Sequence, residues 1–137
     1  MNLQFYLEKM QSFDAFKKFK KENPKAYFCS GFFIIDKEGK NNQSHLDFFV
    51  PEENKIISFD IASNILQMPV QPFNGKIPEK ISKTLNFDFD KIENLIIEKM
   101  EKENIKNKIQ KIILSLQNVG GEIFLIGTIF VLVVIRN

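Results

Sequence analysis

The sequence has few of the side chains from which catalytic and metal sites are usually built. It contains one cysteine, Cys29, and one histidine, His45. A single cysteine excludes an internal disulfide framework and a zinc site built from several cysteines, so nothing ties the chain to an oxidising compartment. The first residues lack a basic start followed by a sustained apolar stretch, so we expect no signal peptide and a cytoplasmic protein.

Arginine is nearly absent from the sequence, and tryptophan is absent. Arg136 is the only arginine among nineteen basic residues, there is no tryptophan, and the formal net charge is +2. Nucleic-acid grooves and phosphates are often bound by the planar guanidinium of arginine, and so small a net charge gives no strong field to attract a polyanion. We therefore expect no nucleic-acid partner.

The aromatic residues are mostly phenylalanine, fifteen against two tyrosines. Phenylalanine fills cores, whereas tyrosine and tryptophan, with their polar tips, are favoured at recognition surfaces. A chain of 137 residues can bury a sizeable core without support from disulfides or metals. The composition therefore predicts a single domain over residues 1–137.

The longest apolar run lies at residues 123–135 (IFLIGTIFVLVVI) and carries no charge. A membrane helix, a buried soluble helix and a central β-strand compete for it. As a helix the run would span roughly 20 Å, which is short of the ~30 Å hydrocarbon core of a bilayer. Most of its residues are β-branched, which favours a strand. We therefore expect a strand, and a membrane partner is not expected.

Two of the predicted strands are apolar in both alternating phases. In residues 123–135, and again in residues 25–36 (KAYFCSGFFIID), large apolar side chains occupy odd and even positions alike. A strand of this kind needs apolar cover on both faces of its sheet. Helices can cover one face, so a second copy of the chain, a partner segment or an apolar ligand would have to cover the other.

The N-terminal half predicts helix followed by three strands. Apolar residues spaced three and four apart over residues 3–22 indicate an amphipathic helix, which Asn23-Pro24 would end. Ser12 could cap a second helix, so one kinked helix and two separate helices both stay open. Short turns between the next three strands indicate an antiparallel meander. We expect these strands at residues 25–36, 43–50 and 55–62.

The C-terminal half predicts a loop, a long helix and the final strand. Residues 63–88 hold three of the five prolines, so we expect a loop or crossover there. Asp90 begins a D-x-x-E capping box, and apolar residues recur at helical spacing over residues 90–116, with a phase slip at residues 101–104. We expect a long helix that is bent or broken near Asn104 and stopped by Gly120-Gly121. The order α-β-β-β-α-β predicts an α+β fold, with a mostly antiparallel sheet of about four strands and two helices packed on one face.

The candidate catalytic residues lack partners. Cys29 lies in an apolar strand, where a cysteine is usually a small buried residue, and the only histidine is expected on another strand. His45 and Asp47 share a strand face and could exchange a proton, but we interpret them as an exposed pair on an edge strand. One histidine also makes a transition-metal site unfavourable. We therefore expect no enzyme and no catalytic, metal or cofactor site.

A group of lysines lies near the end of the first predicted helix. The negative end of the helix dipole stabilises cations at this position, which explains why most of these lysines occur there. A weak contact with an anionic surface is the alternative. The group consists of Lys17, Lys18, Lys20, Lys21 and Lys25.

The leading hypothesis for function is a non-enzymatic interaction module. It would homodimerise, or hold a segment of a protein partner, through the open face or edge of its sheet. A carrier of an apolar small molecule between helices and sheet is the second hypothesis, and a membrane-attached protein that inserts residues 123–135 is the third. The candidate interface residues are Phe28, Phe32, Ile34, Phe124, Ile126, Phe130, Leu132 and Val134.

Overall fold

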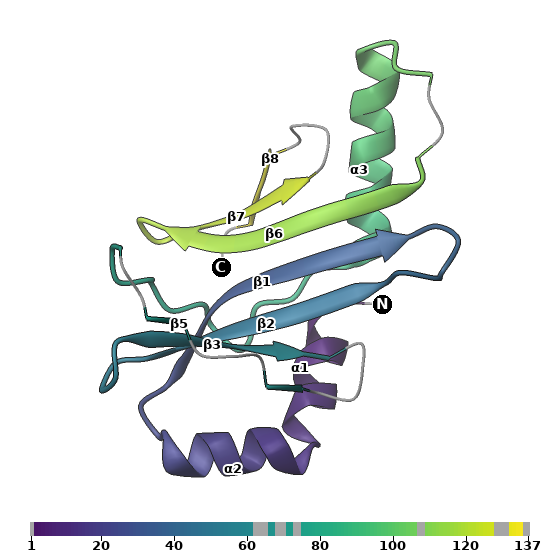
Figure 1. Cartoon of the computed structure of the whole chain (residues 1–137). Coiled ribbons are helices and arrows are strands. Elements are labelled where there is room, and N and C mark those ends of the chain that lie inside the picture. Colours follow the sequence, from purple (N-terminus) through teal and green to yellow (C-terminus); the bar gives the residue numbers. More distant parts are fainter. Residues whose placement is uncertain are drawn as a thin grey trace.

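The computed structural model describes residues 2–61, 66–67, 71–72, 75–106, 109–127 and 132–135 (Figure 1). For residues 66–67, 71–72, 123–127 and 132–135 only the backbone is described. The helices are α1 (Leu3–Gln11), α2 (Asp14–Glu22) and α3 (Phe89–Lys102). The strands are β1 (Tyr27–Asp36), β2 (Gln43–Val50), β3 (Lys55–Asp60), β4 (Leu66–Gln67), β5 (Gln71–Pro72), β6 (Lys111–Val119), β7 (Glu122–Gly127) and β8 (Leu132–Ile135).

The strands form one antiparallel sheet in the order β4-β3-β2-β1-β6-β7-β8, with β5 also paired to β3. Strand β1 lies near its middle, between the sequence neighbour β2 and the distant β6. The predicted α+β class and antiparallel sheet are confirmed. In the described part of the chain the sheet has eight strands, more than the four or so expected. The additional strands are β4 and β5 in the predicted loop over residues 63–88, β6 in the predicted long helix, and one more because the run at residues 123–135 contributes to two strands.

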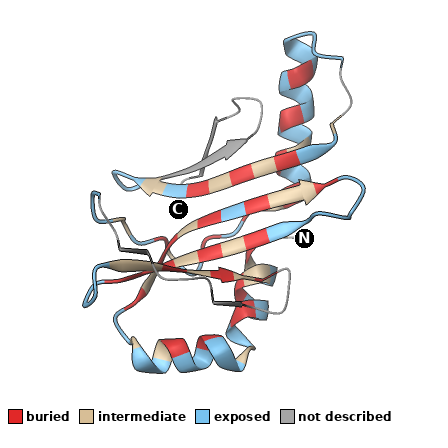
Figure 2. Cartoon of the chain, viewed as in Figure 1, coloured by how far each residue is buried: buried red, intermediate tan, exposed pale blue. Residues whose placement is uncertain are grey.

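All three helices of the described residues pack on one face of the sheet, as predicted. Side chains from each helix join one buried cluster with residues of β1, β2, β3 and β6. Figure 2 marks the buried residues of these elements. Phenylalanine dominates this core: the ring of Phe59 lies 5.4 Å from that of Phe16 and 5.1 Å from that of Phe19, measured between centroids. The expected use of phenylalanine as core filling is thus confirmed.

The N-terminal helical segment is two helices. Ser12 ends α1 at its C-cap, where the Ser12 hydroxyl donates a hydrogen bond to the carbonyl of Lys9 at 2.7 Å. Phe13 is the N-cap of α2 and makes no capping bond with its side chain. The separate-helix alternative is therefore right, whereas the expectation that Ser12 caps the second helix is wrong.

The expected bend or break near Asn104 is confirmed, but the second half of the predicted helix, after this break, is wrong. Helix α3 ends at Lys102, Asn104 takes a left-handed backbone with φ of 55°, and residues 111–119 form β6. Alternate residues of β6, such as Ile112 and Leu116, are buried. These two residues are four positions apart. That spacing places residues on the same face of a helix and also on the same face of a strand, so it does not distinguish the two. The N-cap is Asp88, whose Oδ1 accepts from the Asp90 amide at 2.8 Å, so the capping box is also misplaced.

The apolar run at residues 123–135 contributes to two strands. Gly120 and Gly121, at φ of 62° and 87°, form the turn that joins β6 to β7, and β8 then pairs with β7. Two consecutive residues with positive φ are what a tight hairpin turn requires. The expectation that these glycines stop a helix is therefore wrong. The strand character of the run is confirmed for β7 and β8, and residues 128–131 lie outside the described residues.

Candidate functional site

A β-bulge in β1 decides which side chains lie on the side of the sheet away from the helices, here called the outer face. Phe28 pairs with Phe48 of β2, but the next pair joins Ser30 to Asp47, so β1 has one extra residue at Cys29. The extra residue reverses the alternation of the strand. Phe28 and Phe33 consequently both enter the core although they lie an odd number of residues apart.

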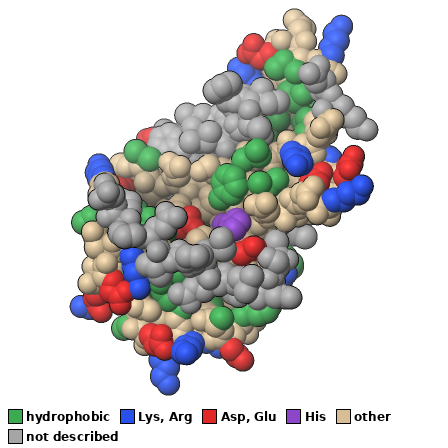
Figure 3. All heavy atoms as spheres, in the orientation of Figure 1, with side chains coloured by type: hydrophobic (Ala, Val, Ile, Leu, Met, Phe, Trp, Pro, Cys, Tyr) green, Lys and Arg blue, Asp and Glu red, His purple; other side chains and the backbone are tan. Residues whose placement is uncertain are grey.

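The outer face carries apolar side chains near its centre. Phe32 on β1 is 36% exposed, Ile34 beside it is half-buried, and Ile113 on β6, the register partner of Ile34, is half-buried as well. We call these three residues the outer patch. Figure 3 views this side of the molecule and shows hydrophobic side chains grouped beside the single histidine.

The predicted interface residues divide into three groups. Phe32 and Ile34 lie on the outer face, in the outer patch. Phe28 was expected beside them and is instead fully buried among the helix-facing residues, because the bulge lies between it and Phe32. The backbones of four other predicted residues lie in β7 and β8, but their side chains are outside the described part of the structure. These four are Phe124, Ile126, Leu132 and Val134. The whole of Phe130 lies outside the described part too.

Polar residues on β1, β2 and β3 adjoin the outer patch. The Ser30 hydroxyl donates to Oδ2 of Asp47 at 2.7 Å. His45 pairs in register with Phe32 on one side and with Asp60 on the other, and its ring centroid lies 6.4 Å from that of Phe32. Within the described residues no hydrogen bond joins His45 to Asp47. The two share a face as predicted and form no proton-transfer pair. The expectation of an exposed pair on an edge strand is wrong, because both residues are half-buried and β2 is an interior strand of the sheet.

Cys29 is buried at the bulge with 3% of its surface exposed. Its thiol donates to the backbone carbonyl of Asp47 at 3.5 Å. Burial is the largest cause that raises the pKa of the Cys29 thiol to about 12, and the Asp47 carboxylate adds to the effect. A thiol that stays protonated at neutral pH is a poor nucleophile. The predicted role of Cys29 as a small buried residue matches its position.

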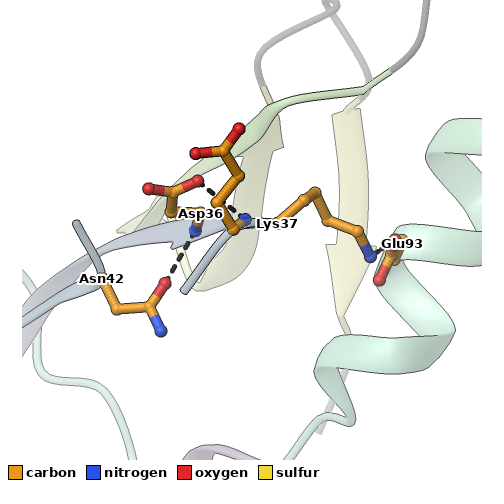
Figure 4. Close-up of polar contacts among 5 residues, drawn as sticks. Asp36, Lys37, Asn42 and Glu93 are labelled. Carbon is orange, nitrogen blue, oxygen red and sulfur yellow. Dashed lines mark hydrogen bonds and ion pairs between the residues drawn. The ribbon is translucent and has the colours of Figure 1, made fainter. Parts of the chain in front are cut away.

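Several polar contacts surround Asp36, in the turn from β1 to β2 (Figure 4). Its carboxylate accepts from the backbone amides of Glu38 at 3.0 Å and Asn41 at 3.1 Å, and its own amide donates to the side-chain oxygen of Asn42 at 2.7 Å. Next to it, Lys37 forms an ion pair with Glu93 of α3. This arrangement fixes a turn and fastens it to a helix. No group of His, Cys, Asp or Glu side chains within the described residues could hold a metal ion.

The Asp36 turn should weaken in acid. The hydrogen bond from the Glu38 amide is the largest cause that lowers the pKa of Asp36, and the amides of Asn41 and Lys40 and the charge of Lys111 act in the same direction. A lowered pKa stabilises the fold above about pH 4, the ordinary range of an aspartate, and this contribution is lost as the pH falls through the lowered value. We expect the thermal midpoint of Asp36→Asn to fall less than that of the wild type on acidification.

Thermal melts of the wild type and Asp36→Asn at a series of pH values from neutral to about pH 2.5 measure this effect. The series extends into the acid range, where native carboxylates become protonated. Glu52→Gln is the matched control, since Glu52 is an exposed carboxylate in the turn from β2 to β3. An acid response that is identical in the two variants would contradict the assigned role of Asp36.

Sequence reasoning missed part of the outer patch. Ile113 was placed in the long helix, so it could not be assigned to a sheet face. The alternation of buried Ile112 and Leu114 with half-buried Ile113 and Ser115 is visible only after β6 is known to be a strand. Ile113 follows Ile109 by four residues, a spacing that also suits a helix, so the local sequence gave no signal for its place in the sheet.

Two further findings concern the class of protein. None of the helices in the described part of the chain combines the length and the apolar character needed to cross a bilayer. Comparisons with protein-family models, curated proteins and solved structures find no match to this chain. Function must therefore be inferred from the geometry of the chain itself.

Proposed function

We propose that the chain is a non-enzymatic interaction module that homodimerises through the outer face of its sheet. The observation that carries this proposal is the outer patch: Phe32, Ile34 and Ile113 meet on two central strands, on the face that no helix of the described residues covers. Apolar side chains grouped on an uncovered face favour association. A segment of another protein could use the same face, and the proposed setting is the cytoplasm.

The surroundings of the outer patch suit a protein interface. His45, Asp47 and Ser30 lie on neighbouring positions of the outer face, so polar groups border the apolar centre. Protein interfaces commonly combine an apolar centre with a polar rim, and aromatic residues near the centre contribute much of the binding energy. Phe32 is thus the side chain whose loss should weaken association most.

The packing between helices and sheet gives less support to a carrier of a small apolar molecule. Phenylalanine rings from α2, β2 and β3 lie against one another there; the ring of Phe48 is 5.2 Å from that of Phe16 and 6.0 Å from that of Phe59. A surface hollow between α2 and the turn from β2 to β3 is lined by charged side chains, including Lys18, Glu22, Glu53 and Lys55. An apolar ligand prefers a pocket with an apolar lining.

The dimer proposal predicts that Phe32→Lys dissociates the protein. A lysine at this position removes the aromatic surface and brings like charges together across a two-fold interface, so we expect the dimer to weaken by at least about tenfold. The measurement is sedimentation equilibrium at tens of micromolar protein. Phe5→Lys is the matched control, because Phe5 on α1 is 44% exposed and changes charge identically.

Two results would contradict the dimer. One is a wild-type protein that stays monomeric at these concentrations and fails to bind a dye that reports exposed apolar surface. The other is a Phe32→Lys protein that associates as strongly as Phe5→Lys. A monomer that does bind the dye would favour a partner segment as the occupant of the outer face.

A further inference from the structure

Three lysines from distant parts of the sequence come together beside the first residues of β1. Lys20 lies on α2, while Lys80 and Lys83 lie in the irregular segment that precedes α3. We call these three residues the lysine cluster. It includes only one member of the lysine group at the end of the first helix, so the sequence alone could not have defined it.

Hydrogen bonds hold the Lys20 ammonium beside the segment that carries Lys80. The ammonium donates to the carbonyl of Ala26, immediately before β1. The following two residues of the chain bond directly to the other segment: the Tyr27 hydroxyl donates to the carbonyl of Pro78 at 2.6 Å, and the amide of Ile81 donates to the carbonyl of Phe28 at 2.8 Å. Hydrogen bonds to main-chain carbonyls therefore bring together the segments that carry the lysines.

The positions of Lys80 and Lys83 are fixed from two sides. The side-chain amide of Asn118, on β6, donates to the Lys80 carbonyl at 2.7 Å, and the side-chain amide of Gln4, on α1, donates to the Lys83 carbonyl at 2.7 Å. Between them the side chain of Ile81 is completely buried. A surface fixed in this way loses little conformational entropy when it binds a partner.

None of the three lysines in the cluster forms an ion pair within the described part of the chain; the ion pairs there involve other lysines, such as Lys18 with Glu22 at 4.0 Å. Burial, followed by the positive charges of Lys83 and Lys80, lowers the pKa of Lys20. Like charges held together repel, so an anion bound among them would be favourable.

We propose that the lysine cluster binds an acidic protein segment rich in aspartate and glutamate. The side chains of Lys80 and Lys83 are exposed, and their backbones are preformed for such a partner. Carboxylates complement compact ammonium charges, whereas a site for nucleic acid would normally use arginine, and Arg136 is the only arginine of the chain. A net charge of +2 also favours a short acidic segment over a long polyanion.

The test compares two variants of the full chain that each lose two positive charges. Lys80→Gln/Lys83→Gln alters the cluster, and the matched control Lys91→Gln/Lys106→Gln removes two exposed lysines elsewhere. The probe is a fluorescent oligoglutamate peptide, and its anisotropy reports binding at low ionic strength. We expect the cluster variant to bind about tenfold more weakly and the control to stay within about twofold of the wild type.

Three outcomes would overturn the proposal: no binding of oligoglutamate by the wild type, equal losses in the two variants, or a preference for inorganic phosphate or an oligonucleotide of matching charge. Thermal melts of both variants show whether they fold, which Lys80 and Lys83 should allow because their carbonyls, not their side chains, make the fixing bonds. Phe32→Lys alters the outer face and should bind the peptide as the wild type does. A failure of the lysine-cluster proposal would therefore not count against the outer-face dimer.

Discussion

Phe59→Ala should destabilise the protein by about 3–5 kcal/mol, the range for removal of a fully buried phenylalanine. The ring of Phe59 contacts rings from α2 and β2, with centroids 5.1 Å from Phe19 and 6.0 Å from Phe48. Its removal leaves a cavity between the helix and the sheet, where packing holds these two layers together. Because domains of this size are stable by only about 5–15 kcal/mol, the variant should be close to unfolding at physiological temperature.

Urea denaturation followed by circular dichroism measures the effect. Phe5→Ala is the matched control, since it removes the same side chain from an exposed position on α1 and should cost less than about 1 kcal/mol. If the urea midpoints of the two variants fall equally, Phe59 does not occupy the core position assigned to it. A large loss confined to Phe59→Ala would establish that this ring joins α2 to the sheet.

The meander was predictable because its turns are marked in the sequence. Gly39 and Asn54 take positive φ angles of 75° and 50° in the turns on either side of β2. Glycine and asparagine adopt this geometry more readily than other residues, so they indicate where strands end. Strand β2 was accordingly predicted with its observed bounds, Gln43–Val50.

The phase slip at residues 101–104 indicated a break near Asn104, but periodicity did not predict that a strand follows it. Ile105, Ile109 and Ile112 continue the apolar stripe of the preceding helix at spacings that suit a helix. The chain nevertheless leaves the helix at Asn104, and residues 111–119 pair with the central strand β1. Hydrogen bonds to a strand distant in sequence outweigh a local helical preference, and a single sequence does not reveal that pairing.

The composition of the outer face was hidden for a related reason. Strand β1 is apolar in both alternating phases, so a pattern of apolar residues looks the same with or without the extra residue at Cys29. Phe28 was therefore assigned to the wrong face, while Phe32 was assigned correctly because it lies beyond the bulge together with Ile34. The lysine cluster depended on hydrogen bonds between the start of β1 and the segment before α3, which local sequence does not reveal.

The Cys29 thiol should react with alkylating reagents about a thousandfold more slowly in the folded protein than in urea at pH 8. Burial raises the pKa of Cys29 to about 12, whereas a free cysteine has a pKa near 8.5. The thiolate is the reactive form, so its fraction at pH 8 is roughly a thousand times smaller in the folded state. Iodoacetamide labelling followed by mass spectrometry measures both rates.

The matched control places a cysteine on the surface of the same sheet: Val119→Cys in a Cys29→Ser background, at a position that is 56% exposed in the wild type. That thiol should react at nearly the same rate with and without urea. If Cys29 is labelled as fast as this control, the bulge does not bury its side chain.

The raised pKa of Cys29 also predicts how the stability of the fold changes in alkali. Its contribution is complete below about pH 8.5 and is lost as the pH rises towards 12, because the unfolded chain gives up the thiol proton first. A protein that became more stable over this alkaline range than its Cys29→Ser variant would contradict the buried bulge, and with it the register that places Phe32 on the outer face.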